Sequence, residues 1–521
     1  MGNVKSDTLL LAVLVLFFLV IAVPRLMLPA LDHGDDWSDA QSFIAAENYA
    51  RYGFARTALL PVFSLHGKGL DDPYRTYPSL TILLHGVARV FLHARSLYFY
   101  RGCALLLSFF NCLLWYVFIR RLTGRPLAAF FCSFFYLFNP FFIFGIDAVN
   151  TYSFGDFLRS SLLCAFLFLQ DAPRSRGSMF FLGVWALFFI ESLVSYESCL
   201  YLGVFFMLFR YFFKSRASLT FRQTCILLCA PVAGFLLHFL QNAWFFGSIP
   251  VAFWDLVRLV MERASHRPDV LGKVAFADWF NLVVVRNFSL ALVLPWGTLL
   301  CGAVALLFLS RRLPPEHREA LRRLMLLGAL FFLCGISWYI AAPLHSFAHA
   351  YVYFLVRHVV PFAAVSLSIF FYGAFIYLRG RKRPERLLVL SIVLFMVFVY
   401  VDDGVEKKML PFSAKARASA ADFRQFSLCL FHAGRLTQEN ETIGTNYFRY
   451  PPMTYYSNRN YQVIDKGVLM ADGAVLPKYF MFVPDYTVET GRLLRFLRQK
   501  YTPLLRCQSK YPTGIFFELN G

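Results

Sequence analysis

The densest cluster of reactive side chains is an acidic segment with four aspartates in eight residues, Asp32-His33-Gly34-Asp35-Asp36-Trp37-Ser38-Asp39. An apolar run over residues 9–28 comes directly before it. Because ionisable groups are costly in lipid, a cluster at the end of such a run must lie in water or in a polar cavity. The segment is either a solvated loop that caps the next helix or a catalytic loop with a carboxylate as general base. Residue types alone favour the solvated loop.

A helix is predicted directly after this acidic segment, over residues 40–52. Gly53 suits the position after its last turn, and Ser38 or Asp39 suits its N-cap. Asp39 would then stand where the helix dipole stabilises negative charge.

A second polar segment follows, and it carries two cations, Lys68 and Arg75. A guanidinium fork suits phosphate oxygens, so this pair could hold a phosphate group. Neutralising the nearby carboxylates is the alternative, and the sequence does not decide between them.

Four other acidic residues lie near predicted outer turns: Asp147, Asp156, Glu191 and Glu197. As isolated residues they are expected to cap helices rather than to catalyse a reaction.

The last distinctive stretch runs from His345 to His358. Tyr353 and Arg357 are four residues apart and would share a helix face. Arg357 lies inside an apolar run, so it needs a partner such as an anionic head group, or it snorkels to the interface. His345 and His349 could also share a face, but without a third ligand at a clear spacing they do not predict a metal site.

The composition indicates a polytopic helical membrane protein. Of 521 residues, 58% are hydrophobic, 16% are charged and 61 are Phe. The net charge of +20 does not indicate nucleic-acid binding, because the basic residues cluster between apolar runs, as in cytoplasmic loops. No nucleic-acid-binding pattern is present.

The positive-inside rule gives a topology of about eleven spans with Lys5 in the cytoplasm. The run over residues 79–92 is too short to cross and is expected to be interfacial or re-entrant. The expected spans are residues 9–28, 97–119, 127–146, 157–169, 179–190, 199–213, 225–246, 288–309, 324–342, 351–378 and 387–401. The predicted domains are residues 1–402, with a first outer loop over 30–96, and an extracytoplasmic domain over 403–521.

The C-terminal region is expected to be a small α/β domain. Strands are predicted at residues 441–446, 461–465, 478–484, 503–508 and 514–519, and helices at 421–433 and 491–500. Cys429 and Cys507 lie in this region, and a disulfide between them is possible in an oxidising compartment.

No nucleotide-binding motif is visible, so a reaction at the outer face needs a donor that is already activated. A lipid-linked donor meets this need, because a lipid phosphate leaves with little acid help. The remaining requirement is a general base, which a carboxylate can supply.

The sequence resembles the GT-C glycosyltransferases, in particular the bacterial polyprenyl-phosphate-sugar-dependent branch of protein O-mannosyltransferases and aminoarabinose transferases. The likeness rests on residues 37–54, on Arg75-Thr76-Tyr77-Pro78-Ser79-Leu80, which is similar to the family's Tyr-Pro-Pro-Leu element, and on residues 138–156 and 349–361. Ser79 replaces the second proline of that element.

The resemblance implies a GT-C fold and an inverting transfer from a polyprenyl-phosphate sugar to an extracytoplasmic glycolipid, glycan or protein. By its distance to Gly53, Asp39 best matches the family's catalytic carboxylate, and Asp36 is the close alternative. The residues implied in substrate binding are Asp35, Lys68, Arg75, Tyr77, Asp156, His349, Tyr353 and Arg357. Some GT-C members use a divalent metal and others need none, so the metal stays open.

The implied location is the bacterial cytoplasmic membrane, with the active site on the outer face and membrane lipid as a partner. Two other functions compete: a lipid or glycan transporter or flippase, and a lipid-linked glycan ligase or polymerase. Aspartates clustered at the outer mouth favour a transferase, whereas charges along the midplane favour a transporter. The donor sugar and the acceptor cannot be read from the sequence.

Overall fold

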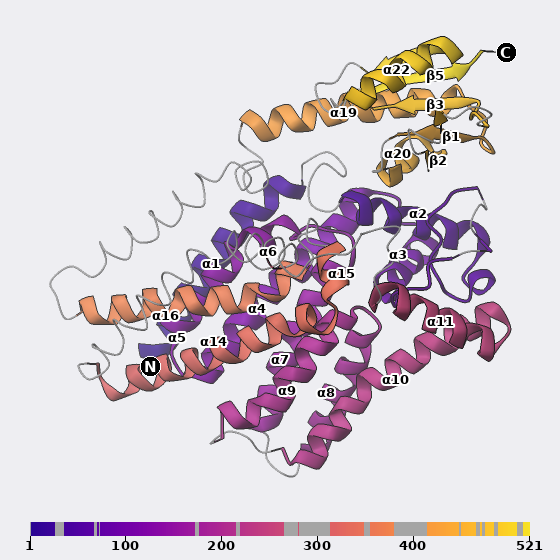
Figure 1. Ribbon diagram of the computed structural model, residues 1–521. Coiled ribbons are helices and arrows are strands. Elements are labelled where there is room, and N and C mark those ends of the chain that lie inside the picture. Colours follow the sequence, from indigo (N-terminus) through magenta and orange to yellow (C-terminus); the bar gives the residue numbers. More distant parts are fainter. Residues whose placement is uncertain are drawn as a thin grey trace. The chain divides into compact units, whose positions relative to one another are not determined.

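Figure 1 shows the helices and strands of the computed structural model. By its internal contacts the chain forms two compact units. Unit 1 combines Met1–Val23, Thr76–Leu80 and Arg101–Met409, and unit 2 combines Pro24–Arg75, Thr81–Tyr100 and Leu410–Gly521. The structure describes residues 2–26, 36–66, 70–71, 73–171, 177–214, 219–264, 280, 313–348, 355–379, 414–446, 450–464, 469–470, 475–483, 488–507 and 514–520.

Unit 1 is a helical assembly, although residues 24–26 and 97–100, at the ends of two of its helices, belong to unit 2. Its described elements are α1 (Gly2–Leu26), α4 (Leu97–Thr123), α5 (Pro126–Leu137), α6 (Pro140–Phe144), α7 (Thr151–Gln170), α8 (Gly177–Ser192), α9 (Tyr196–Phe212), α10 (Phe221–Phe246), α11 (Ile249–Ala264), α14 (Pro315–Ala341), α15 (Pro343–Ala348), the 3-10 turn η4 (Leu355–His358) and α16 (Val360–Arg379). Within the described ranges, α1, α4, α7, α10 and α14 are long and apolar enough to cross a membrane. The chain is therefore a multi-pass membrane protein, as predicted. The expected spans at residues 288–309 and 387–401 lie outside the described residues.

Aromatic side chains fill the interior of unit 1. Helix α5 packs on α16, and α14 packs on both α9 and α16. The rings of Phe131 and Phe135 stack or tilt against Phe371, and Trp115 stacks on Phe331 with ring centroids 5.4 Å apart. The high Phe content thus serves helix-to-helix packing.

The expected span over residues 127–146 is wrong as a single helix. Helix α5 ends at Leu137, and the short α6 starts at Pro140. Pro140 has no backbone N–H to continue the first helix, and the Asn139 side chain accepts a hydrogen bond from the Phe141 N–H as the N-cap of α6. An Asn-Pro pair inside an apolar run therefore breaks the helix here.

The ends of α1, α4, α7 and α14 meet at one end of unit 1. Three ion pairs join them: Arg120–Asp7 at 3.1 Å, Arg121–Asp171 at 2.8 Å and Arg125–Glu316 at 2.7 Å. The Arg323 guanidinium also donates to the Leu122 carbonyl, at 2.8 Å. The eleven-span topology predicts that all four ends are cytoplasmic, and their contacts are consistent with that prediction.

The predicted first outer loop contributes α2 (Asp36–Tyr52), the 3-10 turn η1 (Ala55–Thr57) and α3 (Leu80–Phe91). All but Leu80 belong to unit 2. Helix α3 has 12 residues, so the expectation of a helix too short to span is confirmed.

The C-terminal region of unit 2 is an α/β domain, as predicted. Its elements are α19 (Ala414–Arg435), β1 (Thr442–Thr445), α20 (Tyr450–Ser457), β2 (Asn460–Val463), β3 (Tyr479–Phe482), α22 (Val488–Lys500), β4 (Tyr501–Cys507) and β5 (Gly514–Leu519). The strand order is β2-β1-β3-β5-β4, with β1 parallel to β2 and β3, and β5 antiparallel to β3 and β4. All five predicted strands are present. Helix α20 was not predicted, and its Pro451 and Pro452 lie in the first turn, where a missing N–H breaks no helical bond.

A disulfide joins Cys429 on α19 to Cys507 on β4, with Cα atoms 5.4 Å apart. The bond lies in the apolar cluster that packs α19 against the sheet, and this cluster includes Phe426 and Phe516. The possible pairing of these two cysteines is therefore confirmed in the structure.

Candidate active site

Asp39 lies in the first turn of α2 and is buried, with 5% of its surface exposed. The expected cap at Ser38 or Asp39 is wrong, because α2 begins at Asp36 and both residues are helical. The helix extends one turn further back, and acidic side chains are favourable in that turn because it carries the unpaired N–H groups. The backbone of Asp36 is helical, and its side chain lies outside the part of the chain that the structure describes.

The loop after α2 fixes the far end of that helix. Asn48 donates to the carbonyls of Val62 at 2.8 Å and Ser64 at 2.7 Å. The Tyr49 hydroxyl donates to the Leu59 carbonyl at 2.7 Å. Gly53 adopts φ +80° directly after the last turn, which confirms the predicted helix end. Asp39 is thus carried on a helix whose C-terminal end is restrained.

Helix α3 packs closely on the same part of α2. Gly86 faces the Tyr49 ring, and a Cβ atom at position 86 would clash with it. Arg89 donates two hydrogen bonds to one oxygen of Glu47, from Nε at 2.9 Å and from Nη2 at 2.7 Å. Through these contacts, residues 47–49 fix α2 against the loop that follows it and against α3.

The C-terminal domain also contacts this loop within unit 2. The Leu65 N–H donates to Asn460 Oδ1 at 2.7 Å, and Asn460 Nδ2 donates back to the Leu65 carbonyl at 2.9 Å. The rings of Phe43 on α2 and Tyr455 on α20 lie 5.3 Å apart. The helix that carries Asp39 thus belongs to one compact unit with the C-terminal domain.

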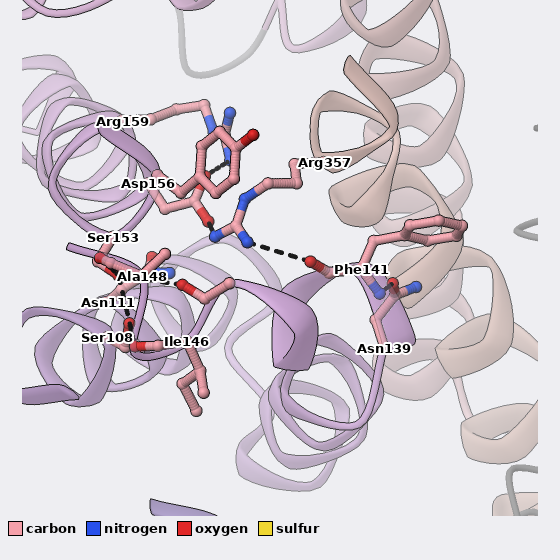
Figure 2. Close-up of polar contacts among 12 residues, drawn as sticks. Ser108, Asn111, Asn139, Phe141, Ile146, Ala148, Ser153, Asp156, Arg159 and Arg357 are labelled. Atoms are coloured by element: carbon pink, nitrogen blue, oxygen red, sulfur yellow. Dashed lines mark hydrogen bonds and ion pairs between the residues drawn. The ribbon is translucent and has the colours of Figure 1, made fainter. Parts of the chain in front are cut away.

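A separate buried cluster surrounds Asp156 in unit 1 (Figure 2). Arg159 Nη2 donates to Asp156 Oδ1 at 2.5 Å, and Arg357 Nη2 donates to Oδ2. Arg159 also donates to His358 Nδ1 at 2.9 Å, and Arg357 donates to the Phe141 carbonyl at 3.1 Å. The cluster joins α6, α7 and η4.

Asp156 and Asp147 do not cap helices, so that expectation is wrong. The N-cap of α7 is Asn150, whose side chain accepts from the Tyr152 N–H. Asp147 instead pairs with Arg101 across 3.4 Å, and both side chains are buried. Each aspartate is needed in the interior because a buried guanidinium requires a nearby anion.

Arg357 is 3% exposed, so its guanidinium does not snorkel to a surface in the described structure. It lies 5.1 Å from the Tyr152 ring and 5.9 Å from the Phe142 ring. Asp156 forms direct ion pairs with both Arg159 and Arg357, and the fully buried Glu191 adds an electrostatic interaction with Arg159. Contact of Arg357 with a lipid phosphate stays a prediction.

Tyr77 is part of a third polar network, also in unit 1. Its hydroxyl donates to Glu197 Oε1 at 2.9 Å and lies 2.7 Å from His345 Nε2. The other nitrogen, His345 Nδ1, accepts from the Trp338 indole N–H at 3.1 Å, and the Ser195 hydroxyl donates to Glu197 Oε2 at 2.9 Å. We call these residues the Tyr77 relay: Trp338, His345, Tyr77, Glu197 and Ser195.

The structure brings together one pair of the predicted site residues, Asp156 and Arg357. Arg75 donates to the Pro73 carbonyl at 3.2 Å and belongs to unit 2 with Asp39. Asp35, Lys68, His349 and Tyr353 lie outside the described residues.

The sequence pattern does not predict the roles of Arg159, His358 and Trp338, and it predicts Glu197 as a helix cap rather than as a hydrogen-bond partner of Tyr77. One signal was available for Arg159, because Asp156 stands three residues before it and such a pair meets on one helix face. No group of three or more His, Cys, Asp or Glu side chains in the described part of the chain could hold a metal ion.

Comparison with known proteins gave matches among solved structures. No protein-family model matches the chain, and no curated protein does. ArnT from Cupriavidus metallidurans in the apo state superposes with a TM-score of 0.57 at 11% identity, over 99% of this chain and 98% of ArnT. The same protein bound to undecaprenyl phosphate gives 0.55 at 10% identity, over 98% and 97%.

The archaeal oligosaccharyltransferase AglB from Archaeoglobus fulgidus, in complex with an inhibitory peptide and a dolichol-phosphate, also matches. Its TM-score is 0.53 at 11% identity, over 92% of this chain and 69% of AglB. ArnT and AglB are both GT-C glycosyltransferases. The chain therefore has the GT-C fold, with several apolar spans and a small C-terminal sheet.

Proposed function

We propose that this protein is an inverting membrane glycosyltransferase. It moves a sugar from a polyprenyl-phosphate donor to a glycolipid, glycan or protein at the outer face of the bacterial cytoplasmic membrane. The supporting observation is the superposition with ArnT, which covers nearly the whole of both chains and includes a form bound to undecaprenyl phosphate.

The proposed reaction needs one base and one charged contact for the leaving group. An acceptor hydroxyl or amine attacks the anomeric carbon, forming the new bond to that carbon. The bond from the carbon to the phosphate oxygen breaks, and polyprenyl phosphate leaves with the electron pair. The acceptor proton passes to a carboxylate. The configuration of the anomeric carbon is inverted because the acceptor attacks one face of that carbon while the phosphate leaves from the opposite face.

Asp39 is the proposed base, and Asp36 is the alternative. Burial of Asp39 in the first turn of α2 supports this role, because the unpaired N–H groups of that turn favour an ionised carboxylate. The restraints on α2 described above would hold the carboxylate in place. Asp35 remains a candidate for substrate binding.

Phosphate binding is assigned to at least one of Lys68, Arg75 and Arg357. Arg357 already pairs with Asp156, so a phosphate there would compete with a buried carboxylate. Lys68 and Arg75 are therefore the stronger candidates. The remaining proposed contacts are Tyr77, Asp156, His349 and Tyr353.

A lipid-linked glycan ligase is the second candidate, and the superposition with AglB favours it. A transfer assay with the purified protein in detergent separates the two candidates. It supplies cell-envelope acceptors together with either radiolabelled polyprenyl-phosphate monosaccharides or radiolabelled lipid-linked oligosaccharides. Label moving from a monosaccharide donor supports our proposal, and label moving only from an oligosaccharide donor supports a ligase. Lipid translocation in proteoliposomes without transfer to any acceptor would identify a flippase and refute both.

A further inference from the structure

The Tyr77 relay has a fixed direction, set by the indole of Trp338. An indole N–H can only donate, so His345 Nδ1 must accept. The ring proton of neutral His345 then lies on Nε2, which donates to the Tyr77 oxygen. The Tyr77 hydroxyl in turn donates to the Glu197 carboxylate, which also accepts from Ser195.

This direction limits what else the Tyr77 oxygen can do. Its hydrogen is committed to a carboxylate, and a hydrogen bond to a charged group is roughly twice as strong as one between neutral groups. The phenol oxygen already accepts one hydrogen bond from His345, so in any further contact it can only accept a second one, through its remaining lone pair. A phosphate oxygen carries no hydrogen to give, whereas a hydroxyl or an amine does.

Burial distinguishes Tyr77 from its two direct hydrogen-bond partners, Glu197 and His345. Glu197 is 1% exposed and His345 is 6% exposed, whereas Tyr77 is half-buried. The half-buried ring of Tyr196 lies beside Tyr77, with centroids 5.6 Å apart. The chain after Tyr77 is fixed too, because the Leu80 N–H donates to the Leu193 carbonyl at 3.1 Å.

We infer that the Tyr77 oxygen accepts a hydrogen bond from a hydroxyl or amine of the carbohydrate substrate, and that Glu197, His345 and Trp338 are positioning residues for it. This inference rests on the proposed function. It assigns Tyr77 to the carbohydrate rather than to the lipid phosphate. Three segments far apart in the sequence thereby converge on one contact.

The experiment compares Tyr77→Phe, Glu197→Ala and Glu197→Gln with the wild-type protein. Two quantities are measured: kcat/KM for sugar transfer, and binding of undecaprenyl phosphate alone. Tyr77→Phe and Glu197→Ala are each expected to lower kcat/KM about tenfold or more, mainly through KM, with unchanged lipid-phosphate binding. Glu197→Gln should recover most of the loss, because its amide oxygen still accepts the Tyr77 hydrogen.

The double variant Tyr77→Phe/Glu197→Ala should lose little more than either single variant, because both changes remove the same positioning. Ser346→Ala is the matched control. Ser346 is buried next to His345 but bonds only within its own helix in the described contacts, to the Ala342 carbonyl at 2.9 Å. Its kcat/KM should stay near that of the wild type.

Three results would overturn the inference. One is a Glu197→Gln loss as large as that of Glu197→Ala, which would mean that the charge itself acts. Another is a weakened lipid-phosphate affinity in Tyr77→Phe, which would place the phosphate at this residue. The third is a fully additive double variant.

A wild-type protein that binds undecaprenyl phosphate without transferring sugar refutes only the proposed transfer. Tyr77 is then tested by binding of the intact sugar donor. Unchanged donor binding in Tyr77→Phe refutes the inference.

Discussion

At the scale of single residues, Asp156 is the buried anion that bridges two buried guanidiniums. Its two oxygens each accept from a different buried guanidinium, one on its own helix and one on η4. Removing this carboxylate would leave Arg159 and Arg357 facing each other without the anion between them. Uncompensated buried charge is among the costliest defects a protein can carry.

We therefore expect Asp156→Ala to lower the free energy of unfolding by about 3–5 kcal/mol. Denaturation of the purified protein in detergent measures this change. Glu319→Ala is the control, because Glu319 pairs with Arg322 and Arg323 while its own side chain is 40% exposed. That variant should lose less than about 1 kcal/mol. Equal losses in both variants would show that the Asp156 cluster contributes no special stability.

The second expectation concerns the cations proposed for the lipid phosphate. Replacing the residue that holds it, among Lys68, Arg75 and Arg357, should weaken donor binding by about 1.5–3 kcal/mol, the scale of a charge-assisted hydrogen bond. Titration of undecaprenyl phosphate against each alanine variant measures the loss. Arg121→Ala is the control, because Arg121 pairs with Asp171 at the end of unit 1 that is predicted to be cytoplasmic. Normal affinity in all three variants would place the phosphate elsewhere.

The sequence predicted which single residues are unusual better than it predicted their partners. Arg357 stood out as a cation inside an apolar run, but its partner lies 201 positions away, and no local pattern links the two. Glu197 was read as a cap for the same reason, since its hydrogen-bond donor Tyr77 is 120 positions away. Local spacing identifies such residues, whereas tertiary packing chooses their contacts.

At the scale of elements, the two hydrogen bonds between Asn460 and Leu65 join β2 to the loop that follows α2. We expect Asn460→Ala to loosen that loop, because the Leu65 N–H and carbonyl would lose their buried partners. Hydrogen exchange of the Leu65 amide should accelerate about tenfold or more.

Asn446 offers a matched control within the C-terminal domain. It also makes two hydrogen bonds with one backbone residue, Val483, at 2.6 and 2.9 Å. Asn446→Ala should therefore destabilise the sheet locally but leave the Leu65 amide protected. Unchanged exchange at Leu65 in Asn460→Ala would mean that the loop holds its shape without the C-terminal domain.

Elements with a strong local pattern were predicted well. The five C-terminal strands and the end of α2 at Gly53 follow from alternation and glycine chemistry. The start of α2 and the break at Asn139 were not predicted. At both places the local sequence is compatible with either a helical or a non-helical backbone, and tertiary packing determines which of the two forms.

At the scale of the whole molecule, the charge pattern makes a sidedness prediction. The basic ends of α1, α4, α7 and α14 are joined by ion pairs, whereas Tyr77, Glu197 and His345 meet in the relay. The first group is predicted to be cytoplasmic and the second extracytoplasmic. Reporter fusions at Gly380 and Gly521, which lie outside the described residues, should read inside and outside respectively. The same reading from both would rule out the eleven-span topology.

The sequence predicted that the chain has a membrane part and a C-terminal domain, with a boundary near residue 402. By contacts, however, most of the first outer loop groups with the C-terminal domain in unit 2. Hydropathy separates apolar from polar segments, but it carries no signal for which two polar segments pack together. The Asn460–Leu65 bonds supply that pairing, and they require the folded domain.

In the proposed sugar transfer, a carboxylate on α2 is the general base. The most direct measurement is turnover and melting temperature on the same purified Asp39→Asn and Asp36→Asn proteins, with Asp71→Asn as an exposed control from the first loop. We predict that Asp39→Asn loses on the order of a hundredfold or more in turnover while its melting temperature stays near that of the wild type. Asp36→Asn should be second worst, and Asp71→Asn should be unaffected. Near-wild-type turnover in both Asp39→Asn and Asp36→Asn would rule out a catalytic base on α2 and leave Asp147 or Asp156 as the remaining candidates.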